Sequence, residues 1–209
     1  MGEICSDIGA WVQFASMEGF RNIIIEGHSA GAVAIARFLL IGVSRENIRA
    51  AVFASPTDMI GLQLDAHGER FKDLLSLATQ RVAIGEGRSL MLEDTLDGYS
   101  FDALTYLDLF NPGGPSDIFN FRSPERLRHL QALQMPCLFF FGGGHEVCSV
   151  PVADALAALG NQIGASLPVS TTLVSGAPHS YRGYESQIVS IVFDWISQLD
   201  VCRNDEAER

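Results

Sequence analysis

Residues 22–40, NIIIEGHSAGAVAIARFLL, decide the fold of this chain. A short β-branched run, typical of a buried strand, leads into GHSAG (27–31) and then into the apolar spacing of a helix. Gly-x-Ser-x-Gly is common by chance, but between a strand and a helix it predicts a sharp turn that exposes the serine hydroxyl. We therefore predict that Ser29 is a nucleophile. The alternative is that Ser29 only caps the helix.

The two glycines of this motif favour the nucleophile. We expect side chains at Gly27 and Gly31 to collide with the neighbouring strand and helix, whereas a simple cap would not need glycine on both sides. The helix N-terminus behind Ser29 favours developing negative charge, and Ala30 would supply the first N–H of an oxyanion hole. His28 is expected to be a structural neighbour, because it points away from Ser29 on such a turn.

Length and composition set the class of protein. The 209 residues are enough for one sizeable core, and 47% hydrophobic with 19% charged residues is typical of a soluble globular domain. A net charge of −11 argues against a nucleic-acid partner and against docking on an anionic membrane. No run of 18 apolar residues predicts a membrane span, and the N-terminus lacks the layout of a signal peptide. We expect a cytoplasmic protein.

The four cysteines show no paired metal spacing, so the sequence predicts no metal site. Cys137 falls in an apolar run and is expected to be a small core residue.

Strands alternate with helices along the chain, which predicts a parallel sheet in an α/β fold. The expected strands cover residues 22–27, 48–56, 135–144 and 170–179, and the expected helices cover about 6–18, 32–42, 150–160 and 184–199. Residues 59–134 are more polar and mostly helical, without a convincing strand. In parallel sheets, ligands bind beyond the carboxyl ends of the strands. Four polar residues fall there: Ser29, Asp58, Glu146 and His179.

His179 is the predicted general base. A serine hydroxyl is a weak nucleophile and needs a base within hydrogen-bond reach. His179 follows the last expected strand, at the same edge of the sheet as Ser29. His67 and His129 lie in the helical stretch 59–134, where a solvated surface role fits better.

Three motifs resemble those of the α/β-hydrolase superfamily in order and approximate spacing. GHSAG, MPCLFFFG and GAPHS match its nucleophile turn, acid-bearing strand and histidine loop. More narrowly, NPGGPSDIFNFRSPERLRHLQAL followed by GAPHSYRGYE is similar to capped members of the superfamily. The resemblance covers nearly the whole chain, but only about the carboxyl-terminal two-thirds of such a hydrolase. It implies a core at 1–58 and 135–200 and a helical cap at 59–134; residues 201–209 are expected to be a frayed tail.

The sequence leaves open which carboxylate is the acid of the catalytic triad. Relatives usually carry an Asp a few residues after the glycine that ends the third strand, but His145 stands there in this chain. Glu146 is the adjacent carboxylate, and it could reach His179 if the glycine-rich loop shifts by one residue. Asp58, after the second strand, is the rival. A third interpretation is that no acid is in place.

The predicted cap carries apolar side chains that could face the site: Phe101, Tyr106, Leu109 and Phe110. Their helical spacing favours ordinary packing instead. A mostly apolar cap over a serine site would suit a medium-sized acyl or aryl ester.

The resemblance implies a cofactor-free serine hydrolase that cleaves a small or medium ester, thioester or amide through an acyl-enzyme on Ser29. The alternative is a non-catalytic binding protein with a degenerate triad or a missing oxyanion loop. Only one expected helix precedes the strand at 22–26, and no loop for a second oxyanion N–H is visible. We therefore expect either a truncated gene product or a chain that pairs its exposed edge strand with a partner, itself included.

Overall fold

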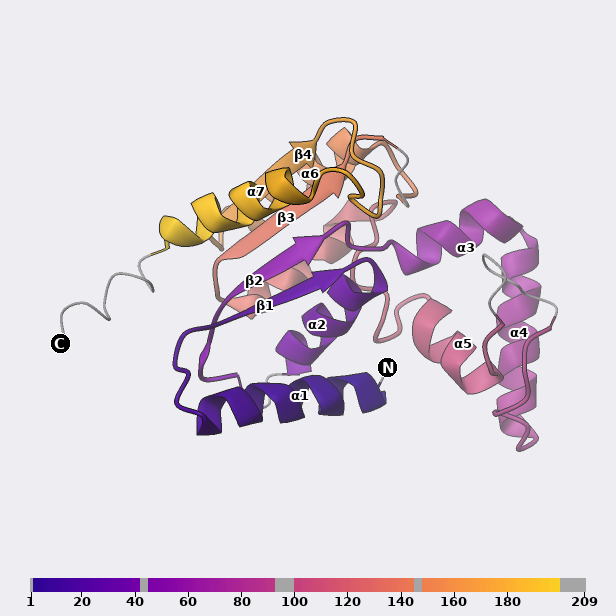
Figure 1. Cartoon of the computed structure of the whole chain (residues 1–209). Coiled ribbons are helices and arrows are strands. Elements are labelled where there is room, and N and C mark those ends of the chain that lie inside the picture. Colours follow the sequence, from indigo (N-terminus) through magenta and orange to yellow (C-terminus); the bar gives the residue numbers. More distant parts are fainter. Residues whose placement is uncertain (1, 42–44, 93–99, 145–147, 200–209) are drawn as a thin grey trace.

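The computed structural model describes residues 2–41, 45–92, 100–144 and 148–199. Strands and helices alternate in the order that the sequence predicts (Figure 1). The strands are β1 (Ile23–His28), β2 (Ile48–Ala54), β3 (Cys137–Gly142) and β4 (Val169–Val174). The helices beside them are α1 (Gly2–Met17), α2 (Ala30–Ile41), α6 (Val152–Ile163) and α7 (Glu185–Ser197). All four expected strands and all four expected helices are confirmed.

The four strands form one parallel sheet in the order β1-β2-β3-β4. The register places Gly27 beside Phe53, and Phe53 beside Phe139. The last strand is shorter than expected, since it ends at Val174 and residues 175–179 form turns. Gly176 there has a positive φ of 78°, a backbone conformation that ends the extended strand.

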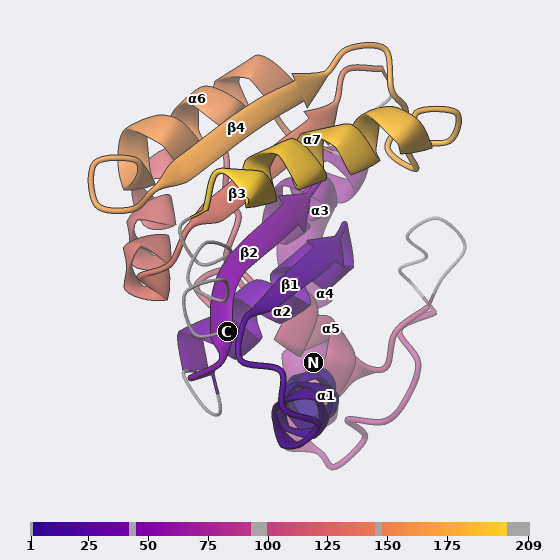
Figure 2. The same cartoon turned by 60° about the vertical axis from the view of Figure 1, so that its left-hand side comes forward.

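Helices cover both faces of the sheet, and strand residues alternate between the two sides. Ala51, Phe53 and Cys137 face a core shared with α2 and α6, whereas Val52 and Leu138 face α7. A sheet buried on both faces explains why these strands read as continuous apolar runs. Figure 2 shows α7 on the near face, with α2 behind the sheet. Burial raises the pKa of the Cys137 thiol to about 12, so it is a core residue as expected.

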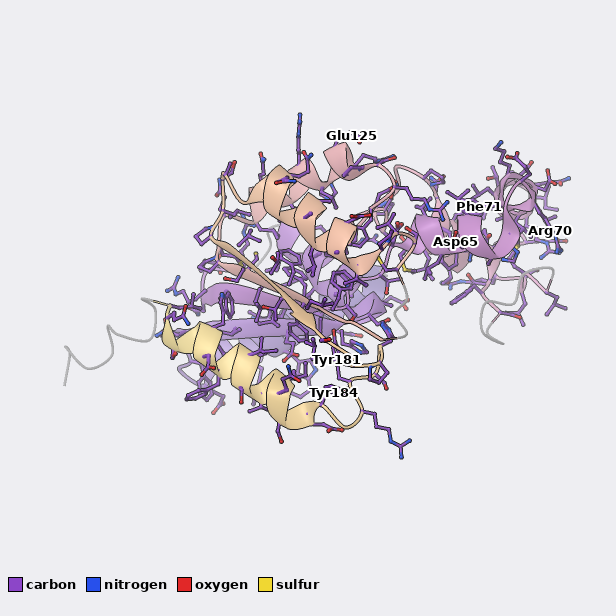
Figure 3. The ribbon with its side chains drawn as sticks, turned by 90° about the horizontal axis from the view of Figure 1, so that it is seen from above. Asp65, Arg70, Phe71, Glu125, Tyr181 and Tyr184 are labelled. Carbon is purple, nitrogen blue, oxygen red and sulfur yellow. The ribbon has the colours of Figure 1, made fainter. Side chains whose placement is uncertain are left out.

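The segment between β2 and β3 is helical. It contains α3 (Met59–His67), α4 (Arg70–Ala83), α5 (Ala103–Phe110) and the 3₁₀ helix η1 (Pro124–Leu133). Figure 1 shows α3, α4 and α5 extending away from the sheet, and Figure 3 places Arg70 and Phe71 at the far end of this projection. By contrast, η1 packs against α6 and α2.

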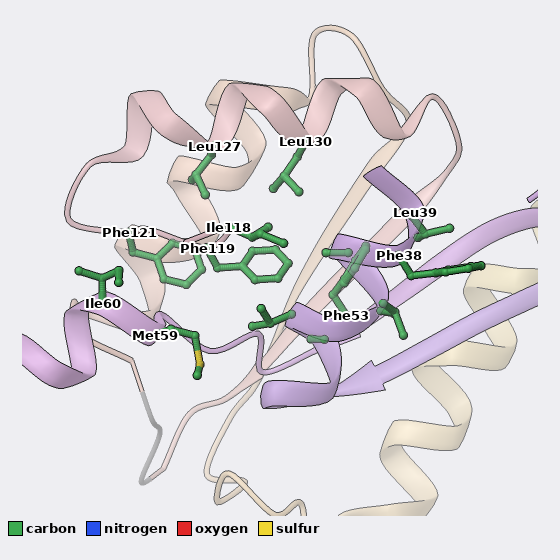
Figure 4. Close-up of a cluster of buried hydrophobic side chains, with 14 of the residues drawn as sticks. Phe38, Leu39, Phe53, Met59, Ile60, Ile118, Phe119, Phe121, Leu127 and Leu130 are labelled. Atoms are coloured by element: carbon green, nitrogen blue, oxygen red, sulfur yellow. The ribbon is translucent and has the colours of Figure 1, made fainter. Parts of the chain in front are cut away.

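An aromatic cluster joins this segment to the sheet (Figure 4). Phe53 stacks on Phe139 with ring centroids 4.7 Å apart, and Phe119 meets Phe53 edge-on at 5.7 Å. Phe121 extends the cluster to Phe141. Because these rings are almost completely buried, the loop after α5 is held against the sheet by apolar packing.

The β1 side of the described sheet is an edge. Beside it, α1 exposes large apolar side chains, among them Trp11, Phe14 and Met17. Trp11 and Phe14 contact each other edge-on, with ring centroids 6.0 Å apart. Contiguous exposed apolar surface of this kind marks interaction sites. None of the helices in the described ranges is long and apolar enough to cross a membrane.

Candidate active site

Ser29 stands alone between the end of β1 and the start of α2. Its backbone φ is 58°, which is uncommon for a residue with a side chain. The Ser29 N–H donates to the carbonyl of Ala54 on β2 at 2.9 Å, and the Ser29 carbonyl accepts from the N–H of Ala32 at 3.0 Å. The strained residue is therefore fixed on both sides by backbone hydrogen bonds. This is the sharp strand–turn–helix that the sequence predicts.

The two glycines of the turn differ, and this corrects one expectation. A Cβ on Gly27 would lie 2.5 Å from the carbonyl oxygen of Gly31 and 2.8 Å from the nitrogen of Ala32, so only glycine fits there. A Cβ on Gly31 would meet no described atom within 4 Å. The expectation that both positions exclude a side chain is wrong for Gly31, because its Cα faces an open space beside the turn.

His179 lies in the turns after β4, and its Nε2 is 3.0 Å from Oγ of Ser29. The structure thus brings together the predicted nucleophile and the predicted base. His28 Nε2 donates to the carbonyl of His179 at 2.8 Å, and the two rings lie 4.8 Å apart. His28 therefore contacts the histidine loop rather than the hydroxyl of its neighbour Ser29.

Tyr181 anchors the same loop to the sheet, a role that the sequence reasoning missed. Its hydroxyl donates to the carbonyl of Phe140 on β3 at 3.2 Å and lies 2.5 Å from Oγ of Ser55. Tyr181 and Ser55 both have positive φ angles, 54° and 43°. Figure 3 shows Tyr181 and Tyr184 beside the start of α7. The available signal in the sequence was the aromatic residue itself, two positions after His179, because aromatic side chains in a loop are often buried.

Thr57 is a second residue that the sequence reasoning missed. Its Oγ1 lies 3.2 Å from Oγ of Ser29, and only 4% of the residue is exposed. Ser29 Oγ can donate its single proton to neutral His179 Nε2 while it accepts a hydrogen bond from Thr57. The position of Thr57 just after β2, at the carboxyl edge of the sheet, was the available signal.

Asp58, the rival acid, caps α3. Its carboxylate accepts hydrogen bonds from the N–H of Gly61 at 2.7 Å, from the N–H of Phe121 at 3.2 Å and from the hydroxyl of Ser149. The residue is completely buried, and this burial raises the pKa of Asp58 although the three donors oppose the shift. These contacts tie α3, the loop at Phe121 and the segment after β3 to one point. None of them is with His179.

Glu146 and His145, the other residues of the open question about the acid, lie outside the described residues. His129 is exposed on η1, as expected. His67 is half-buried on α3 rather than fully solvated.

An apolar cavity of about 610 Å³ adjoins the turn. It lies between the end of β1, the starts of α1 and α2, and α5. Its floor is the backbone of Gly27–His28 and Ala30–Gly31, which explains the open space beside Gly31. Apolar side chains form most of the walls: Ile4, Ile8, Ala34, Ile35, Phe101 and Leu109.

Of the four apolar cap residues singled out in the sequence, two line this cavity and two do not. Phe101 and Leu109 face it. Tyr106 and Phe110 are buried in the core, where their rings pack 5.0 Å apart and the Tyr106 hydroxyl donates to Gln63 at 2.9 Å. Helical spacing alone could not separate the two pairs, because it does not show which neighbour each face meets.

Comparisons with known proteins rest on structure alone. No protein-family model matches the chain, and no curated protein matches it in sequence. Among solved structures, Est1E from Butyrivibrio proteoclasticus is similar over 93% of this chain and 68% of its own, with a TM-score of 0.61 and 19% identity. The esterase domain of a Rhodothermus marinus protein is similar over 91% and 67%, with a TM-score of 0.49 and 13% identity.

At such low identity, a likeness shows the fold and not the chemistry; of these two structures, Est1E has the TM-score above 0.5. The strained serine lies between β1 and α2 of a parallel sheet, and the histidine follows β4. Serine precedes histidine along the chain in the same order in α/β-hydrolases. This chain has the α/β-hydrolase fold.

Proposed function

We propose that this protein is a serine hydrolase that cleaves a small or medium ester, thioester or amide through an acyl-enzyme on Ser29. The observation that carries the proposal is the 3.0 Å contact between Ser29 Oγ and His179 Nε2, on a turn that holds Ser29 at a positive φ. A nucleophile within hydrogen-bond reach of a base, both at the carboxyl edge of a parallel sheet, is the arrangement that acyl transfer requires.

In the first step, Ser29 Oγ attacks the carbonyl carbon while its proton passes to His179 Nε2. The N–H of Ala30 has no acceptor within its own helix, because it belongs to the first turn of α2, and it can donate to the developing oxyanion. The bond to the leaving group then breaks, and His179 returns the proton to that group. His179 then takes a proton from water, which attacks the acyl-enzyme; the bond to Ser29 Oγ breaks, His179 returns the proton to that oxygen, and the acid is released.

For the third member of the triad, we keep Glu146 as the candidate and place Asp58 second. The carboxylate of Asp58 is occupied by the N–H groups of Gly61 and Phe121 and by the hydroxyl of Ser149. A carboxylate with three donors has little capacity left for an imidazole N–H. Asp58 therefore fits a structural role.

Binding without catalysis is the second candidate function, and one observation favours it. β1 is the edge of the described sheet, so no neighbouring strand of that sheet brings a second N–H donor to the side of Ala30. Loss of one oxyanion donor typically lowers kcat by about 10²–10³-fold. A protein of this kind would keep the pocket and lose most of the turnover.

Labelling with a fluorophosphonate probe separates the two functions. We expect the wild-type protein to be labelled once, on Ser29, and Ser29→Ala to be unlabelled. Thr57→Ser, which retains a hydroxyl beside the nucleophile, is the matched control and should label like wild type. Labelling that persists in Ser29→Ala would overturn the assignment of the nucleophile. A folded wild-type protein that is not labelled would favour the binding protein.

A further inference from the structure

We infer that the apolar cavity beside Ala30 binds the acyl chain of the substrate, and that the preferred substrates are uncharged esters with an apolar acyl group of medium length. The substrate preference rests on the proposed function, because it requires turnover at Ser29. Binding of an apolar chain in the cavity does not require turnover and is tested separately below. The volume of about 610 Å³ is in the range of small-molecule sites.

The position of the cavity relative to the two reacting groups selects the acyl chain as its occupant. The leaving group must lie near His179, because His179 gives it a proton. His179 and Thr57, which both contact the hydroxyl, do not line the cavity, and neither does Ser29 itself. The cavity instead borders the backbone on the two sides of Ser29, at His28 and at Ala30, whose N–H is the proposed oxyanion donor. The part of the substrate left for the cavity is the acyl chain.

The chemistry of the walls determines the class of acyl group. Ile8, Ile35, Phe101 and Leu109 offer only hydrocarbon to an occupant, so each buried methylene of the ligand strengthens binding. Glu26, an exposed residue, also lines the cavity, and its carboxylate disfavours an anionic ligand. A neutral ester is therefore accepted, whereas the carboxylate produced by hydrolysis is repelled.

The walls are held in place before any ligand arrives. Arg37 on α2 forms a two-pronged ion pair with Asp108 on α5, with Nη1 at 2.9 and 2.8 Å from the two carboxylate oxygens. Burial alone would raise the pKa of Asp108, but the net pKa is lowered, with the hydrogen bonds and charge of Arg37 among the causes. Leu109 therefore sits on a helix that is fixed against the helix bearing Ala34 and Ile35. A preformed pocket loses little affinity to ordering.

Binding is measured in Ser29→Ala, where no turnover interferes, with octanamide as a neutral analogue of the acyl chain. Calorimetry should show saturable binding with a negative heat-capacity change. Two variants fill the cavity from different helices, Ile8→Trp on α1 and Ala34→Phe on α2, and each should weaken binding at least tenfold. Ala10→Trp is the matched control, because Ala10 is an exposed residue on α1 that does not line the cavity.

With Ser29 intact, p-nitrophenyl esters from acetate to octanoate give the catalytic reading. kcat/KM should rise up to about fourfold per methylene, since burying a methylene contributes about 0.8 kcal/mol. Ile8→Trp or Ala34→Phe should remove this dependence, whereas Ala10→Trp, which lies outside the cavity, should keep both the dependence and the wild-type rate on acetate. Absent octanamide binding, or equal binding in the folded filled variants, overturns the cavity assignment whatever Ser29 does. Octanamide binding without fluorophosphonate labelling would overturn the acyl-enzyme instead.

Discussion

Oγ of Ser29 and Nε2 of His179 lie 3.0 Å apart, although 150 positions separate the two residues in the chain. The parallel sheet places both residues at its carboxyl edge, but β1 and β4 are the outer strands of the described sheet, so the loop after β4, anchored to β3 by Tyr181, must carry His179 back toward Ser29. His179 is further held by the hydrogen bond from His28 to its carbonyl. This hydrogen bond restrains the backbone of the loop that carries the imidazole.

His179→Ala should lower kcat by on the order of 10⁴-fold or more, because Ser29 then lacks a base. His28→Ala removes the ring that holds the carbonyl of His179 but keeps the base, and it should lower kcat by at most about tenfold. Steady-state rates with p-nitrophenyl butyrate measure both. Equal losses of kcat in His179→Ala and His28→Ala would mean that His179 does not act as the base and only supports the structure of its loop.

Thr57→Val should slow acylation of Ser29 about five- to fifteenfold, because it removes one hydrogen bond to the nucleophile without changing the shape of the side chain. Thr57→Ser keeps the hydroxyl and should stay within about threefold of wild type. The rate of fluorophosphonate labelling reports this step directly. An unchanged rate in Thr57→Val would show that the 3.2 Å contact does not orient Ser29.

Asp58→Asn should destabilise the fold by about 2–4 kcal/mol, because an amide NH₂ then faces buried donors. The pKa of Asp58 is raised by burial, so the folded state binds its proton more tightly than the unfolded state. The contribution of Asp58 to stability is therefore greatest below about pH 4 and falls as pH rises through the raised pKa. Urea unfolding at pH 4 and pH 7 should show the gap between wild type and Asp58→Asn shrinking at the higher pH. A gap that grows would mean that the carboxylate is stabilised in its charged form.

Glu146→Gln should leave the free energy of unfolding nearly unchanged and lower kcat by about 10²–10⁴-fold if Glu146 is the acid. Asp58→Asn is the comparison, and kcat measured on its folded fraction should fall far less. The reverse pattern would transfer the role to Asp58. Small effects on kcat in both variants would indicate a triad without a working acid.

Gly27→Ala should destabilise the protein by at least about 3 kcal/mol, because the added Cβ would lie 2.5 Å from a backbone oxygen. Gly31→Ala is its matched control within the same motif. The new methyl group would enter open space at the start of α2, and alanine favours a helix by about 0.5–1 kcal/mol. Thermal unfolding of both variants should therefore give shifts of opposite sign. A stable Gly27→Ala would show that the turn can relax away from α2.

The edge of β1 should pair with the same edge of a second copy. Ile23 and Ser29 donate their N–H groups toward β2, so by alternation the N–H groups of Ile24 and Glu26 point to the free edge. Light scattering should show an associated wild-type protein. Glu26→Pro, which removes one outward N–H, should weaken the association, whereas Glu26→Ala, which keeps it, should not. A monodisperse wild-type monomer with ordinary esterase turnover would refute this expectation.

The local sequence determined the strands, the helices and the turn at Ser29. Continuous apolar runs such as CLFFF predict strands buried on both faces, and Gly-x-Ser-x-Gly after such a run predicts the turn. These signals depend on residues within a few positions of one another. The edge of the sheet at which His179 lies also followed from sequence, because a parallel sheet places every strand end at one edge, whereas the contact with Ser29 depends on the loop after β4.

The tertiary structure alone decided which distant side chains meet. It placed Thr57 beside Ser29, gave Asp58 three donors from three segments, and left open space beside Gly31 but none beside Gly27. It also turned Phe101 and Leu109 toward a cavity while Tyr106 and Phe110 joined the core. The physical reason is the same in each case. Periodicity fixes the face of an element on which a residue lies, but the partner of that face depends on how elements far apart in the chain pack together.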